Sequence, residues 1–122
     1  MSTRPEATAL RTWARGDHPS EAAVELLLRA FGGRFARREH PWVRVDGHVI
    51  WIDWTRLTEE NTAVYSGGER RLLEIAASIG NGDPVDLANA ITALDAARLD
   101  LVLAALAHCA GLGALHPWPT HR

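Results

Sequence analysis

Apolar residues recur at helical spacing in several segments of the chain, and each segment is bounded by residues that begin or end helices. A segment that starts near Asp17 shows this most clearly, because its apolar positions follow the i, i+3, i+4, i+7 rule as far as Gly32-Gly33. Its stripe is Val24, Leu27, Leu28 and Phe31. The same pattern predicts further helices over about residues 4–15, 69–79 with Gly80 closing it, 84–94 and 96–110, and a short helical turn near 55–61.

Between residues 42 and 54 the apolar period changes to two, which predicts a β-hairpin. Asp46-Gly47 separates two β-branched and aromatic runs, the strongest short-range hairpin signal. With these two residues as the turn, Trp42 would lie opposite Trp51 on the outer face, beside Arg44. The inner face would pack on the helices and consists of Val43, Val45, Ile50, Ile52 and Trp54. The predicted fold class is α+β, with five or six helices packed on one face of the hairpin. The pattern predicts one domain over residues 1–113 and an irregular tail over 114–122.

The amino-acid composition limits which chemical mechanisms and cross-links are open to the chain. The 122 residues carry a net charge of −2, and all 13 basic residues are arginine, which excludes mechanisms that need a lysine amine. The one cysteine, Cys109, cannot form an intrachain disulfide and is expected to be a small buried apolar residue. We see no apolar run of signal-peptide or membrane-spanning length, so the expected location is cytoplasmic.

A Ser-Gly-Gly turn that leads into a predicted helix carries a short resemblance. Residues 65–71, Tyr-Ser-Gly-Gly-Glu-Arg-Arg, resemble the signature sequence of ABC-type ATPases, in which such a turn contacts a nucleotide phosphate. The resemblance covers about a dozen residues, and the chain has no Walker A motif. Ser66 and Glu69 have the spacing of a capping box, which we take as the interpretation of these residues.

Arginine and tryptophan gather around the predicted hairpin. Five arginines between residues 29 and 44, opposed only by Glu39, give a local charge of +4. Such a surface suits a protein partner or single-stranded nucleic acid, because both favour arginine interleaved with aromatic rings. The other interpretation is a solvated loop whose arginines balance acidic neighbours. The predicted interaction surface consists of Trp42, Trp51, Arg44, Arg34, Arg37 and Arg38.

The last predicted helix is apolar on most sides, and between Leu99 and Ala110 its only formal charge is Asp100. Such a helix is either the centre of the bundle, which we favour, or partly covered by another subunit. The residues predicted for a subunit interface are Leu99, Val102, Leu103 and Leu106.

No set of residues in the sequence predicts catalysis, a cofactor or a metal. No histidine pair has tight ligand spacing, so His116 and His121 with another histidine are a weak zinc candidate. We therefore predict a non-enzymatic protein–protein interaction or adaptor module that forms homo-oligomers. A nucleic-acid-binding accessory protein is the first alternative. A small enzyme or ligand-binding domain is the second, and it would bring together distant residues such as His40, Asp53 and Glu69.

Overall fold

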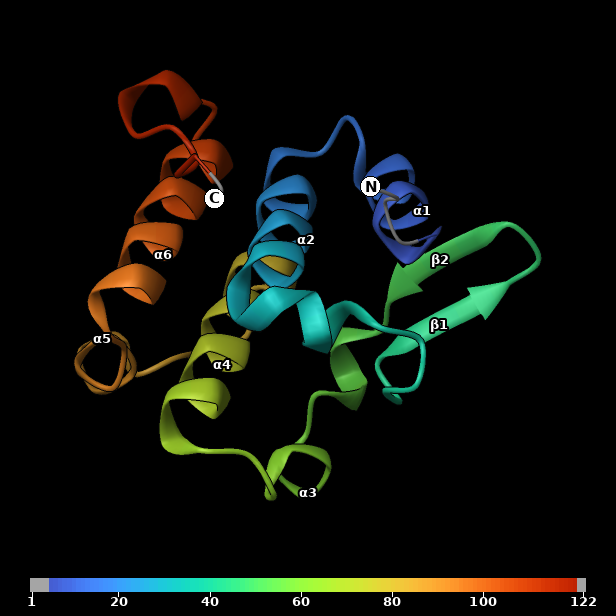
Figure 1. Ribbon diagram of the computed structural model, residues 1–122, viewed down its shortest axis with the longest axis horizontal. Helices are drawn as coiled ribbons and strands as arrows, with labels where there is room; N and C mark the ends of the chain where they lie inside the picture. The colour runs from blue at the N-terminus through green and yellow to red at the C-terminus, as the bar shows by residue number, and fades with distance from the viewer. Residues whose placement is uncertain (1–4, 121–122) are drawn as a thin grey trace.

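The computed structural model describes residues 5–120, which form a mostly helical α+β fold with one β-hairpin (Figure 1). The α-helices of the described residues are α1 (Pro5–Ala14), α2 (His18–Arg29), α3 (Glu59–Thr62), α4 (Gly67–Asn81), α5 (Leu87–Thr92) and α6 (Ala96–Cys109). The two strands are β1 (Val43–Asp46) and β2 (Val49–Ile52), and short 3₁₀ helices cover η1 (Ala30–Ala36), η2 (Trp54–Arg56) and η3 (Gly113–Leu115). This confirms the predicted fold class.

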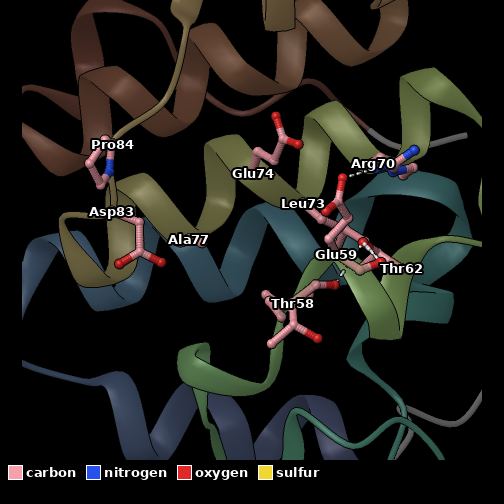
Figure 2. Close-up of a pocket in the computed structure, with 10 residues that line it drawn as sticks. Thr58, Glu59, Thr62, Arg70, Leu73, Glu74, Ala77, Asp83 and Pro84 are labelled. Carbon is pink, nitrogen blue, oxygen red and sulfur yellow. Dashed lines mark hydrogen bonds and ion pairs between the residues drawn. The ribbon is translucent and has the colours of Figure 1, made fainter.

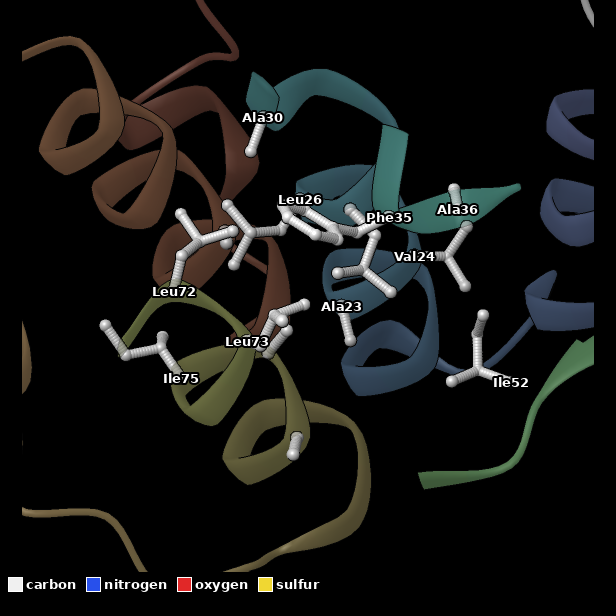
Figure 3. Close-up of a cluster of buried hydrophobic side chains, with 14 of the residues drawn as sticks. Ala23, Val24, Leu26, Ala30, Phe35, Ala36, Ile52, Leu72, Leu73 and Ile75 are labelled. Atoms are coloured by element: carbon white, nitrogen blue, oxygen red, sulfur yellow. The ribbon is translucent and has the colours of Figure 1, made fainter. Parts of the chain in front are cut away.

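The centre of the fold is α2, which contacts α1, α4, α6 and η1. Five of its residues are buried, and three of them (Ala22, Ala23 and Val24) are small enough for neighbouring helices to approach closely. In Figure 3, Ala23 and Leu26 of α2 lie near Leu72 and Leu73 of α4 in one apolar cluster. The preferred prediction that the last helix is the bundle centre is wrong. α6 packs on α2 from one side and lies at the edge of the fold, far from the hairpin (Figure 1).

The hairpin forms where it was predicted, but its register differs by two residues. Asp46 pairs with Val49 and Arg44 with Trp51, so the loop consists of Gly47 and His48 rather than Asp46 and Gly47. Gly47 has φ 62 and is the only one of the two with a positive φ, as in a type II′ turn. The predicted turn would have required a positive φ at Asp46, which costs energy in any residue with a Cβ.

A shift of two residues preserves the faces of a strand, so the predicted inner face is largely correct. Val43, Ile50, Ile52 and Trp54 are buried, and β2 packs on α1. Val45 is exposed because it lies near the tip of the hairpin, which extends beyond α1 (Figure 1).

Both ends of α4 are fixed by local hydrogen bonds and backbone geometry. Ser66 Oγ accepts a hydrogen bond from the Glu69 backbone N–H at 3.3 Å, and the Glu69 carboxylate accepts one from the Ser66 N–H at 2.9 Å. This confirms the capping box. The helix does not end at Gly80 as predicted, because it continues to Asn81 and Gly82 supplies the left-handed cap with φ 76. Gly80 has a different role, which is close contact with the Trp54 indole.

A left-handed turn follows α2. Phe31, Gly32 and Gly33 have φ values of 52, 67 and 77, so the chain leaves the helix after Arg29, before the predicted stop at Gly32-Gly33. A Cβ on Gly33 would lie 2.9 Å from the Leu28 carbonyl oxygen, so this position accepts only glycine. The ring of Phe31 offsets some of its backbone strain by packing edge-on against Phe35, at 5.8 Å between centroids.

Beyond η3 the described chain has no helix or strand, and it is attached to the bundle by side chains. The last two residues of the predicted tail, 121 and 122, lie outside the described residues. The Trp118 indole N–H donates to Nδ1 of His108 at 3.2 Å, and the Arg29 guanidinium lies 5.0 Å from the centroid of the same indole. His116 Nε2 contacts the Asp100 carboxylate at 2.8 Å. Residues 116–119 therefore lie along α6 and the end of α2.

Candidate interaction surfaces

Trp42 is not on the surface, and the predicted pairing of Trp42 with Trp51 is wrong. The Trp42 side chain is 0% exposed, and its indole N–H donates to the Phe35 carbonyl oxygen at 2.8 Å. Trp42 precedes β1, and in the observed register Arg44 occupies the position opposite Trp51. The sequence does not reveal that the indole N–H has a buried acceptor, and this acceptor makes burial of the whole ring favourable.

His40 covers the Trp42 ring and connects three segments. The two rings are parallel within 3° at 4.6 Å between centroids. Nε2 of His40 lies 2.8 Å from the Arg34 carbonyl oxygen, and a carbonyl can only accept, so Nε2 carries the proton. Nδ1 is then free to accept from the Tyr65 hydroxyl at 3.4 Å. Burial lowers the pKa of His40, which keeps the ring neutral. This cluster has a structural role.

Trp51 and Arg44 remain on the outer face of the hairpin, as predicted. They are cross-strand partners, both are half-buried, and Trp51 lies outside the apolar core cluster. The Arg44 guanidinium lies 3.7 Å from the Asp53 carboxylate. Hydrogen bonds from Thr55 lower the pKa of Asp53, with smaller contributions from Arg56 and Arg44, so this carboxylate is charged beside the two arginines. The outer face therefore carries one indole beside two arginines that share the Asp53 carboxylate.

Most of the predicted arginine surface is neutralised within the fold. Arg34 pairs with Glu69 at 2.8 Å, and Arg38 pairs with Glu6 at 3.3 Å. Within residues 5–120, Arg37 makes no ion pair, and its Nε is buried without a hydrogen-bond partner. The acidic partners come from α1 and α4, which are distant in sequence, so local charge counting overestimated the positive potential. This arrangement supports the interpretation of arginines balanced by acidic neighbours.

The four predicted interface residues of α6 lie on one side of the helix, as their i, i+3, i+4, i+7 spacing requires, but they differ in exposure. Val102 is 0% exposed and points into the core, so it is a core residue and its assignment to an interface is wrong. Leu103 and Leu106 are 42% and 41% exposed, and Leu99 is half-buried. At 100° per residue, Leu99, Leu103, Leu106 and Ala110, the residue that follows α6, fall on one stripe, and Val102 lies at its inner edge, about 40° from Leu106. We call these four residues the outer stripe.

Exposed apolar side chains concentrate at and just after the outer stripe. The exposed large apolar residues of the described chain are Val45, Val49, Val64, Leu87, Leu103, Leu106, Leu112 and Leu115. Half of them lie between residues 103 and 115, where Leu112 is 58% exposed and Leu115 is 80% exposed. Asp100, the one formal charge between Leu99 and Ala110, is engaged by His116. The sequence predicted an apolar α6, but only the packing shows which side stays uncovered.

A pocket of about 300 Å³ lies between α4, the α3 region and the turn after α4 (Figure 2). Leu73 and Ala77 are buried residues of its wall, and Glu59, Glu74 and Asp83 are its carboxylates. Glu74 pairs with Arg71 at 2.9 Å, and Asp83 accepts a hydrogen bond from the Asn81 amide at 2.8 Å.

Residues predicted to converge in an enzyme or a metal site do not line this pocket. His40, Asp53 and Glu69 are all absent from its lining, and each has a structural partner of its own. Among the described residues no group of three or more His, Cys, Asp or Glu side chains is arranged to hold a metal ion. The zinc candidate that includes His121 lies partly outside the described residues.

A search of residues 5–120 for membrane-spanning helices found none with sufficient length and apolar character. Comparison of the sequence with protein-family models and with curated proteins, and of the fold with solved structures, found no match.

Proposed function

We propose that this chain is a cytoplasmic, non-enzymatic protein–protein interaction module, and that its main contact surface is the outer stripe of α6 together with Leu112 and Leu115. The observation that carries the proposal is the concentration of exposed leucines in this one short segment. Single exposed apolar residues are normal on a protein surface, whereas a contiguous group marks a contact surface.

The spacing of the stripe favours contact with another helix. Leu99, Leu103, Leu106 and Ala110 follow one another at intervals of four, three and four residues. These are the a and d positions of a heptad repeat, which insert between the side chains of a facing helix. α6 has 14 residues, so the stripe extends over most of its length.

The exposed leucine surface is large enough to contribute to binding. Together the exposed fractions of Leu103, Leu106, Leu112 and Leu115 amount to about two whole leucine side chains. Burying that surface contributes roughly 3–6 kcal/mol. Asp100 is the one formal charge between Leu99 and Ala110, and its contact with His116 reduces the desolvation penalty at this face.

A photo-crosslinking amino acid at Leu103 tests the contact surface in the cells that produce the protein. We expect a discrete covalent adduct at Leu103. The matched control places the same amino acid at Val64, which is 86% exposed and lies away from α6, and we expect no adduct there. Equal labelling at both positions, or no adduct at Leu103, would contradict the proposal.

A further inference from the structure

We infer that the occupant of the outer stripe is a second copy of this chain, with its α6 packed antiparallel to the first about a two-fold axis. The inference rests on the proposed contact surface and names its partner. It requires a stripe that is complementary to itself when reversed, charges that favour the reversed orientation, and enough apolar surface to offset the cost of association.

The outer stripe reads the same in both directions. Its intervals of four, three and four residues are palindromic about a point between Ala104 and Ala105. In an antiparallel pair, Leu103 of one copy therefore faces Leu106 of the other, and Leu99 faces Ala110. A two-fold interface requires this kind of self-complementarity, in which each contact occurs twice.

Charge favours the antiparallel orientation over the parallel one. The chain from residue 83 to Asp100 contains four aspartates and one arginine, whereas residues 101–122 contain no acidic residue and include Arg122. A parallel pair would bring Asp95 beside its own copy and Asp100 beside its own copy. An antiparallel pair brings the acidic end of each α6 to the acid-free end of the other, and it also opposes the two helix dipoles.

A second copy doubles the apolar surface that is buried in the contact. A single stripe with Leu112 and Leu115 contributes roughly 3–6 kcal/mol, while lost translational and rotational freedom costs an estimated 4–15 kcal/mol. Two such surfaces packed together contribute roughly 6–12 kcal/mol. A partner of equal apolar character therefore brings the gain into the middle of the range of that cost, and a second copy is such a partner.

The first measurement is the solution mass of the purified full chain by sedimentation equilibrium. We expect a dimer for the wild type, a monomer for Leu103→Glu and a dimer for the control Val64→Glu. Circular dichroism of each variant establishes that it is folded. A folded wild type that is monomeric at 100 μM would overturn the inference, although a heterologous adduct at Leu103 would leave the proposed function intact.

The second measurement tests orientation with single cysteines in a Cys109→Ala background. Helix axes 8–10 Å apart place facing Cα atoms about 4–6 Å apart, which permits a disulfide. In the antiparallel dimer, a mixture of Leu99→Cys and Ala110→Cys chains gives the mixed disulfide on mild oxidation. Each variant alone gives none, because equivalent residues lie about 16 Å apart along the axis.

A parallel dimer would give the opposite result, with a disulfide in each single variant and none between them. That outcome would overturn the antiparallel arrangement while leaving self-association through α6 supported by the solution mass. A dimer that retains its mass in Leu103→Glu and forms neither disulfide would place the interface elsewhere. It would therefore overturn both the inference and the choice of α6 as the contact surface.

Discussion

Replacing Gly80 by alanine should destabilise the protein, although the same change in an exposed helix interior stabilises by up to about 1 kcal/mol. A Cβ on Gly80 would lie 2.5 Å from Cζ2 and 2.7 Å from Cε2 of Trp54, and 3.0 Å from Cβ of Ala23. Ordinary contacts between carbon atoms begin near 3.5 Å, so the indole must move by about 1 Å. Trp54 is 7% exposed and enclosed by α2 and α4, so this movement disturbs a packed region.

Overpacking of this kind costs typically 1–3 kcal/mol, which exceeds the gain in helix propensity. We therefore expect Gly80→Ala to lower the free energy of unfolding by about 1–2 kcal/mol, measured by urea denaturation. The control is Gly67→Ala in the same helix, where an added Cβ meets nothing within 4 Å. Combining Gly80→Ala with Trp54→Leu should recover part of the loss as a coupling energy. Equal stabilisation by the two glycine variants would refute the reasoning.

Three further predictions test the structural contacts. The His40→Gln variant should lose less stability than the wild type between pH 7.5 and 5 in urea unfolding. The pKa of His40 is lowered in the folded protein. As the pH falls past the ordinary pKa of histidine, the unfolded chain therefore binds a proton at this position that the folded chain does not. Equal losses of stability in the variant and the wild type would contradict this. Trp118→Ala should destabilise by about 1–3 kcal/mol and speed hydrogen exchange of the α6 backbone amides near His108, whereas unchanged exchange would show that the tail contributes nothing. Ser66→Ala should cost about 1 kcal/mol through loss of the cap, and Ser66→Asp should restore most of it.

The sequence predicted elements and faces well because local periodicity determines both. The predicted hairpin kept its inner face even though its register was wrong, since strand faces repeat every two residues and the error was two residues. The choice of loop depended on backbone conformation at Asp46 and Gly47, which the alternation pattern does not contain.

Tertiary packing determined what the sequence could not predict. By its sequence α6 is the more apolar helix, whereas α2 shows one apolar stripe, and only their neighbours decide that α2 is central while Leu103 and Leu106 stay uncovered. Gly80 looked like a helix stop, because its contact with Trp54 joins residues 26 positions apart. Trp42 looked like a surface anchor for the same kind of reason, since its acceptor is the Phe35 carbonyl in a different segment.

The central position of α2 has a consequence for how the protein loses its structure. Because α1, α4, α6 and η1 all pack on this one helix, no neighbour can detach without uncovering part of it to water. The elements should therefore unfold together in a single cooperative transition, and the amides of α2 should exchange only through global unfolding.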